Sequence, residues 1–222
     1  MSTVVTVHHL ELSRSTRVLW ALEELGVAYE LKTYKRHPKT FRAGPEIKQV
    51  HAVGRFPVLT IGDVVLAESG AILEHLADTY DALRPKDASG LRHYRFWLHF
   101  AEGSLMPPLL VALITGRLRT GAPWPVSMLT SAVANKIDQS YTTPQLADLL
   151  GPVDAHLAEH TWFAGENLSM ADIQMSYPVM AALERVRGAK VQHPNMVRWA
   201  AAVQARPAYQ KALEVGGPLL PG

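Results

Sequence analysis

The sequence predicts a small α/β domain followed by an all-helical domain. The first eighty of the 222 residues alternate short β-branched runs with apolar residues at helical spacing, whereas strand signals stop near residue 81. The segment 81–88, which contains Pro85 and both signs of charge, has the composition of a linker. We therefore expect one domain over 1–80 and a helical domain over 89–222.

The N-terminal domain is expected to follow the order βαβ and then ββα. Gly26 closes the first helix as a C′ residue, and the two strands that flank this helix should be parallel. The pair Gly62-Asp63 separates two apolar runs and predicts a hairpin. This order is close to that of the thioredoxin-like fold. The expected strands cover 3–8, 28–34, 56–61 and 64–67, and the expected helices cover 13–25, 46–50 and 68–80.

The remainder of the chain is expected to form a helical bundle whose helices are separated by prolines and a glycine. The expected helices cover 89–118, 126–140, 144–160, 169–186, 194–205 and 207–214, with breaks at Pro123, Pro125, Pro144, Gly165 and Pro207.

The composition excludes several classes of function. The 22 basic and 20 acidic residues are spread evenly, which argues against nucleic acid or an anionic membrane as partner. The start of the chain lacks a basic segment followed by a long apolar one, and the apolar run 105–115 is too short to span a bilayer, so we expect a cytoplasmic protein. The chain has no cysteine, so any thiol chemistry must use a thiol from outside.

Ser13 lies between the first predicted strand and the first predicted helix. A serine at this place often serves as a helix N-cap. Its hydroxyl could instead donate to a bound sulfur, where the positive end of the helix dipole would favour a thiolate. Ser15, two residues further on, could take the same role.

Pro57 begins an apolar strand, where a trans proline is the ordinary case. A cis Phe56-Pro57 bond would free the backbone of Phe56 to pair with an extended peptide ligand. Glu68 and Ser69 begin the next helix and could simply stabilise its first turn. Together they could also bind one carbon that carries both an ammonium and a carboxylate.

Three segments, 8–25, 54–59 and 67–72, strongly resemble the cytosolic glutathione S-transferase superfamily, in its serine-type, theta-like branch. The resemblance spans nearly the whole chain. The segment 162–173 looks like the buried N-capping box of that family, in which Ser169 and the carboxylate three residues later bond each other's backbone N–H groups.

The resemblance implies a glutathione site and a homodimer. Ser13 matches the hydroxyl that activates the sulfur, and Phe56, before the cis Pro57, matches the residue that pairs with the cysteinyl unit. Glu68 and Ser69 match the pair that holds the γ-glutamyl end. Basic residues near the glycyl carboxylate are matched by Arg55 and, more weakly, by Arg42.

The family analogy places the electrophile pocket between the two domains. The apolar residues expected to line it are Phe100, Met106, Leu109, Leu113, Trp124 and Tyr141, although apolar stripes on helices usually face a core. No metal is expected, because neither His8-His9 nor His93 with His99 has a third ligand at suitable spacing.

Three functions are compatible with this site. The first is a glutathione transferase that attacks a small hydrophobic electrophile with the thiolate of glutathione. The second is a glutathione-dependent peroxidase or disulfide reductase that uses two glutathiones. The third is a regulatory protein that binds glutathione without catalysis.

Overall fold

The computed structural model describes residues 4–37, 40 and 42–219, and the N-terminal sheet within them has four strands in the order β2-β1-β3-β4. Strands β1 and β2 are parallel, and β3 is antiparallel to both β1 and β4, as the βαβ-ββα order predicted. The first strand reaches two residues further toward Ser13 than the β-branched run indicated. The strands are β1 Val5–Leu10, β2 Glu30–Tyr34, β3 Val58–Ile61 and β4 Val64–Ala67.

Three helical segments complete this domain: α1 Ser15–Leu25, the 3₁₀ turn η1 Pro45–Gln49 and α2 Ser69–Tyr80. Gly26 ends α1 in the left-handed conformation with φ 64°, and its N–H bonds the carbonyls of the last turn, as predicted. The α/β domain followed by helices is therefore confirmed.

The helical part differs from the prediction in its joins. Pro144 was expected to separate two helices, but α5, η3 and α6 follow one another without a break. A proline is tolerated in the first turn of a helix, and Pro144 follows a π-helical turn that shifts the hydrogen-bond register. The short α8 was not predicted. The segments are α3 Ala88–Phe100, η2 Ala101–Leu105, α4 Met106–Thr120, α5 Val126–Ile137, η3 Asp138–Thr142, α6 Thr143–Glu159, α7 Met170–Arg185, α8 Ala189–Gln192, α9 Pro194–Gln204 and α10 Pro207–Gly216.

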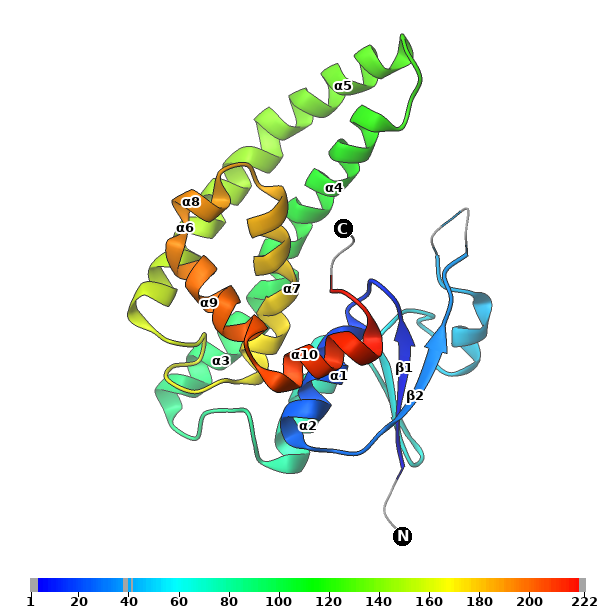
Figure 1. Ribbon diagram of the computed structural model, residues 1–222, viewed down its shortest axis with the longest axis vertical. Helices are drawn as coiled ribbons and strands as arrows, with labels where there is room; N and C mark the ends of the chain where they lie inside the picture. Colours follow the sequence, from blue (N-terminus) through cyan, green and yellow to red (C-terminus); the bar gives the residue numbers. More distant parts are fainter. Residues whose placement is uncertain (1–3, 38–39, 41, 220–222) are drawn as a thin grey trace.

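The continuous helix Ala88–Thr120, formed by α3, η2 and α4, is longer than the apolar run within it suggested. By length and composition it is the one candidate for a membrane span in the described part of the chain, with a mean hydropathy of 1.3 over its best window. The core helix of a water-soluble protein passes the same test. In Figure 1, α4 and α5 form a hairpin that extends away from the rest of the chain.

One hydrophobic core joins the sheet to the helical part. The inner side chains of α1, among them Val18, Leu19 and Leu22, are fully buried and belong to the same cluster as Ile173 and Val179 of α7. The last helix, α10, lies against α1, so the end of the chain returns to its beginning (Figure 1). This return places the carboxyl end of α10 beside β1 and the loop that carries Ser13.

Candidate functional site

The loop between β1 and α1 presents Ser13 in a fixed conformation. Leu12 has φ 52°, a left-handed value that is costly for a residue with a side chain. Arg36, beyond β2, donates from Nε to the Glu11 carbonyl at 3.0 Å and from Nη2 to the Leu12 carbonyl at 2.8 Å. The parallel pairing of β1 and β2 therefore brings a guanidinium to the strained turn and holds it.

Ser13 is not the N-cap of α1. That position belongs to Arg14, whose side chain makes no capping bond. The Ser13 oxygen instead accepts the Ser15 N–H at 3.2 Å and lies 2.7 Å from the Ser15 hydroxyl. Ser15 is completely buried and faces His9, whereas Ser13 is only partly buried and lines a surface hollow. Of the two serines, Ser13 is the one that a ligand can reach.

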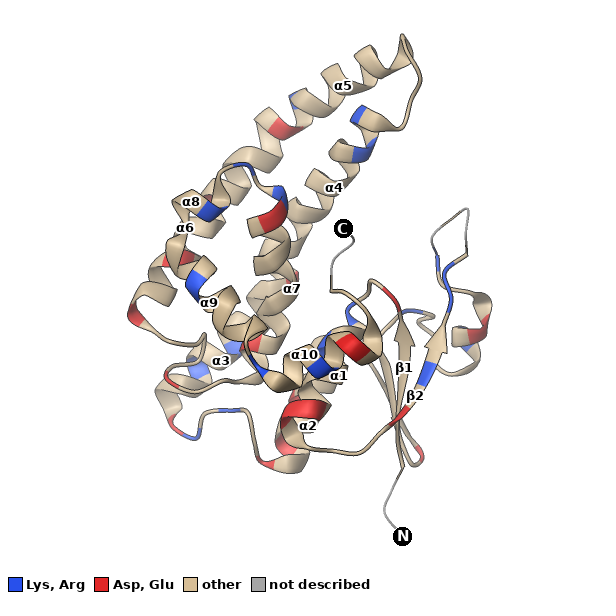
Figure 2. Ribbon diagram, in the orientation of Figure 1, with Lys and Arg blue, Asp and Glu red and all other residues tan. Residues whose placement is uncertain are grey.

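The hollow has a volume of about 270 Å³ and brings four of the predicted site residues together. It is lined by the predicted residues Ser13, Arg42, Arg55 and Phe56 and by Leu10, Leu12, Arg14, Arg36, Ala43 and Tyr177. The four arginines make its rim strongly basic. Figure 2 shows basic residues gathered on the segments around the end of β2 and the loop after it. Such a rim favours a ligand with carboxylates and stabilises a thiolate.

The Phe56–Pro57 peptide bond is cis, which is the isomer that the family resemblance implied. Phe56 is half-buried, and its ring lies 5.0 Å from that of Tyr34. Pro57 is buried behind it at the start of β3. The residue predicted to pair with an extended ligand therefore lies at the hollow.

Glu68 and Ser69 begin α2, as predicted, and neither belongs to the lining of the hollow itself. Glu68 is exposed and has φ 73° and ψ 119°, an unusual backbone conformation for a residue other than glycine. Ser69 is buried, and its hydroxyl accepts from Nη1 of Arg17 at 3.4 Å. The two residues therefore differ, since Glu68 is exposed on a strained backbone and Ser69 is buried against Arg17.

A partly buried ion-pair network behind Ser13 was not predicted from the sequence. Glu102 of η2 accepts from Arg14 Nε at 2.8 Å and from Arg17 Nη1 at 2.7 Å. Burial lowers the pKa of Arg17, although the Glu102 carboxylate opposes this shift. Burial would raise the pKa of Glu102, but the two guanidiniums hold that pKa below its usual value. The guanidiniums of Arg14 and Arg17 lie over the ring of Tyr177 in α7, 5.9 Å and 5.5 Å from its centre. The network connects the helical part to the hollow.

The six residues predicted for the electrophile pocket are not brought together at the hollow. Leu109 belongs to the main core with 2% exposure, and Phe100 and Met106 pack against that core. Trp124 and Tyr141 are exposed, with 80% and 42% of their surface accessible, and Leu113 is half-buried. Among the described residues, none of the six lines the hollow that contains Ser13.

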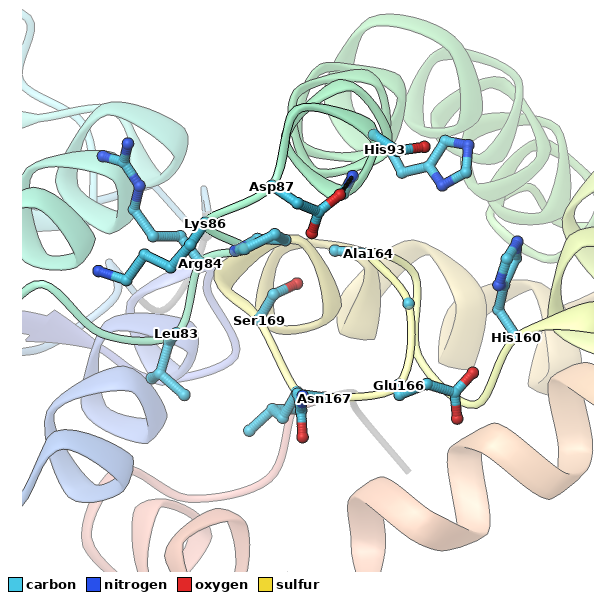
Figure 3. Close-up of a pocket in the computed structure, with 15 residues that line it drawn as sticks. Leu83, Arg84, Lys86, Asp87, His93, His160, Ala164, Glu166, Asn167 and Ser169 are labelled. Atoms are coloured by element: carbon cyan, nitrogen blue, oxygen red, sulfur yellow. Dashed lines mark hydrogen bonds between the residues drawn. The ribbon is translucent and has the colours of Figure 1, made fainter.

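A larger hollow, of about 620 Å³, lies elsewhere. Figure 3 shows it between the linker with Arg84, Lys86 and Asp87 and the segment from His160 to Ser169. It shares no described residue with the hollow around Ser13. In the described part of the chain, no group of three or more His, Asp or Glu side chains is placed to hold a metal ion.

Comparisons with known proteins agree on one family. Residues 2–78 match the model of the glutathione S-transferase N-terminal domain, and residues 118–207 match that of the C-terminal domain. Glutathione S-transferase 1 of Saccharomyces cerevisiae is 33% identical over 222 residues, covering 95% of this chain and 94% of the yeast protein.

Solved structures give the same result. A glutathione S-transferase from Actinobacillus pleuropneumoniae has a TM-score of 0.79 and 33% identity, covering 97% of this chain and 94% of that one. A glutathione transferase from Burkholderia graminis, with two glutathione molecules bound per subunit, has a TM-score of 0.77 and 26% identity, covering 96% and 88%.

Proposed function

This chain belongs to the glutathione S-transferase superfamily, and from that premise we propose that it is a serine-type glutathione transferase in which Ser13 activates the sulfur. The observation that carries the proposal is the position of the Ser13 hydroxyl, at the start of α1 and on a hollow rimmed by four arginines. The chain has no thiol of its own, so the nucleophile is supplied by glutathione.

The ends of glutathione fit the residues around Ser13. Arg42 and Arg55 are suited to the glycyl carboxylate, since guanidinium binds carboxylate through two parallel N–H groups. Glu68 is suited to the γ-glutamyl ammonium, and Ser69 at the start of α2 to the neighbouring carboxylate. The backbone of Phe56 is then left to pair with the cysteinyl unit between them.

The energy required of the site is modest. A free thiol with a pKa near 8.5 is only about 3% ionised at pH 7. Lowering that pKa by ~2 units needs a differential stabilisation of roughly 2.7 kcal/mol. One hydroxyl bond, the dipole of α1 and the basic rim supply effects of this size. Binding and orienting the electrophile must provide the remaining rate enhancement.

Titration of bound glutathione tests this role. The ultraviolet thiolate absorbance is measured against pH for wild type and Ser13→Ala, and the pKa of the bound thiol is expected to rise by about 1–2 units in the variant. The kcat/KM at pH 7 should fall by roughly tenfold to a hundredfold. Ser104→Ala, at a partly buried serine of η2, is the matched control. An unchanged thiol pKa in Ser13→Ala would remove this residue from the role.

A second candidate is a glutathione-dependent disulfide reductase or peroxidase. The similar protein from Burkholderia graminis binds two glutathiones per subunit, which is the number that such a reaction uses. Turnover of an aryl halide, a peroxide and a mixed glutathione disulfide, measured side by side, separates the reactions. Binding of glutathione without turnover of any of the three would favour a regulatory protein.

A homodimer is proposed from the exposed apolar face of the α4–α5 hairpin. Leu110, Ile114 and Leu118 recur at every fourth position of α4 and are 52%, 50% and 37% exposed. Leu129 and Val133 add an apolar stripe on α5. Light scattering should give about twice the chain mass of 24.4 kDa, and Leu129→Asp should lower it to one chain. We also propose a cytoplasmic location, where glutathione is available.

A further inference from the structure

Ser13 is one end of a chain of hydrogen bonds that leads into the protein interior. Its hydroxyl lies 2.7 Å from the Ser15 hydroxyl, which lies 2.8 Å from Nδ1 of His9. Nε2 of His9 lies 2.8 Å from the carbonyl oxygen of Gly216, at the end of α10. Both Ser15 and His9 are buried, with 0% and 1% exposure. The chain connects the reactive position to an imidazole that solvent does not reach.

The partners determine where the hydrogens lie in the free protein. A carbonyl oxygen can only accept, so Nε2 of His9 carries a hydrogen and donates it to Gly216. Burial lowers the pKa of His9, more than the Gly216 carbonyl and the Glu11 carboxylate raise it, so the ring is neutral and Nδ1 is an acceptor. The Ser15 hydroxyl then donates to Nδ1 of His9 at 2.8 Å, which is closer than its other acceptor, the Leu10 carbonyl at 3.2 Å, and the Ser13 hydroxyl donates to Ser15.

This arrangement conflicts with donation from Ser13 to a thiolate. Once Ser13 turns its hydrogen to the sulfur, no hydrogen remains between two oxygens that are 2.7 Å apart. The conflict disappears if Ser15 donates back to Ser13, which requires a hydrogen on Nδ1 of His9 to donate to Ser15. The thiol of glutathione, at the Ser13 end of this series of hydrogen bonds, has a proton to give up.

We propose that His9 is the acceptor of the thiol proton, reached through Ser13 and Ser15. The inference rests on the proposed function of Ser13. The S–H bond breaks as its proton passes to the Ser13 oxygen, the Ser13 proton passes to Ser15, and the Ser15 proton forms the N–H bond at Nδ1. The products are a thiolate and an imidazolium, with no atom or electron gained or lost. His9 does not touch the ligand and acts through Ser15, whose hydroxyl it positions in the free protein.

The surroundings of His9 suit a proton acceptor that is neutral at rest. From the turn that follows its own strand, β1, the charge of the Glu11 carboxylate favours the imidazolium. From α1, His9 meets the hydroxyl of Ser15, and from α10 the carbonyl of Gly216, which accepts from both forms of the ring and favours the charged one. The charged pair of α10, Lys211 with Glu214, is exposed and internally paired. Within the relay, the new positive charge is balanced by the thiolate itself.

The direct test counts protons for each thiolate formed. Glutathione is added to wild-type protein, thiolate is measured by its ultraviolet band, and released protons are measured with an indicator dye in weak buffer. S-methylglutathione, which has no thiol proton, gives the baseline from other groups. If His9 keeps the proton, wild type releases far less than about one proton per thiolate. A wild-type ratio of about one overturns the proposal without any variant.

Three variants separate proton uptake from anchoring. His9→Gln keeps an N–H for the Gly216 carbonyl, His9→Asn keeps an acceptor for Ser15, and Ser15→Ala cuts the relay while leaving the His9–Gly216 bond. None can deliver a proton to a ring nitrogen, so each should release about one proton per thiolate. A thiol pKa in His9→Asn equal to that of wild type would show that His9 only positions Ser15, which overturns the relay.

The two proposals fail in different ways. An unchanged thiol pKa in Ser13→Ala overturns the role of Ser13 and the relay with it. A raised thiol pKa in Ser13→Ala, together with a whole proton released per wild-type thiolate, overturns the relay alone.

Discussion

The beginnings of α1 and α7 are both built around a serine hydroxyl, and they use it in opposite ways. Ser169 is the N-cap of α7 and forms the predicted capping box with Asp172. Ser13 lies one residue before the N-cap of α1, and its hydroxyl has a surface hollow on one side. The serine that satisfies its helix is structural, and the serine displaced from the cap is available to a ligand.

The two networks also differ in how completely they are paired. The Asp172 carboxylate, with no exposure, accepts from Phe163 N–H at 2.9 Å, Trp199 Nε1 at 3.0 Å and both the N–H and the hydroxyl of Ser169 at 2.9 Å. Each donor is used inside the protein. At α1 the Ser13 hydrogen can turn between Ser15 and a ligand, so the network has two arrangements. A fully paired network stabilises the fold, whereas a network in which one hydroxyl can change its acceptor can respond to a ligand.

Breaking the closed network should have the largest effect on stability. Asp172→Ala leaves four buried donors without an acceptor, and we expect the free energy of unfolding to fall by roughly 3–5 kcal/mol. Asp87→Ala is the matched control, because that N-cap carboxylate is exposed and accepts from Gly90 N–H at 2.8 Å, and its loss should cost about 1 kcal/mol. Urea denaturation measures both. Equal losses would show that the four bonds do not act together.

The Asp172→Ala variant also shows whether the starts of α1 and α7 are independent. At temperatures where Asp172→Ala remains folded, the pKa of its bound thiol should equal that of wild type, whereas Ser13→Ala should change the thiol pKa and leave stability almost unaltered. A thiol pKa that moves in Asp172→Ala would mean that the two helix starts are coupled through the core.

The sequence predicted where the candidate site residues stand relative to the nearest strand or helix. Ser13, Phe56 with Pro57, and Glu68 with Ser69 each stand at a join between a strand and a helix or at the start of a strand, and local spacing is enough to place them. The parallel pairing of β1 and β2 also followed from the βαβ order. Arg42 and Arg55 followed from the family resemblance and lie on the hollow.

The parts that were missed depend on contacts between distant segments. Arg14 meets Glu102 across 88 positions, and His9 meets Gly216 across 207 positions. No local pattern records which buried side chains will face one another. The electrophile candidates show the same limit, because helical spacing identified Leu109 as inward-facing without telling a core from a pocket.

A third helix start, that of α2, combines the features of the other two. Glu68 is its N-cap, makes no side-chain capping bond and has φ 73°. Glu68→Gly should raise the free energy of unfolding by about 1 kcal/mol because glycine adopts this backbone without strain. The affinity for glutathione should fall roughly tenfold to a hundredfold through loss of the charge-assisted bond to the ammonium. Calorimetry of unfolding and of binding measures the two effects.

Glu68→Gln is the control for this prediction, since it keeps the strained backbone and removes the charge. It should lose affinity without gaining stability. If the Glu68→Gly variant bound glutathione more tightly than wild type, the backbone strain and not the carboxylate would limit binding.

The smallest expected effect concerns pH, because each network includes a histidine whose pKa burial lowers, His9 at α1 and His156 near α7. His156 donates from Nε2 to the Phe163 carbonyl at 3.0 Å, and its pKa falls to about 4, with His160 and His93 adding to the lowering. The unfolded chain therefore binds more protons than the folded one below pH 6.5, and this contribution to stability is lost as pH falls toward 4.

Asp172 has the opposite sign. Burial raises its pKa to about 6, above the usual 3.8, so the folded chain binds more protons and stability is lost as pH rises through that range.

The variant His156→Gln, which can still donate to the Phe163 carbonyl, removes the contribution of His156 and leaves that of Asp172. Its free energy of unfolding, measured by urea denaturation, should fall less than that of wild type between pH 6.5 and 4.5, and the difference should be less than about 1 kcal/mol because the ring is partly exposed. The number of protons that His156→Gln releases per thiolate should equal that of wild type, whereas the His9 variants should change that number. Parallel curves of unfolding free energy against pH for His156→Gln and wild type would show that His156 does not cause the loss of stability.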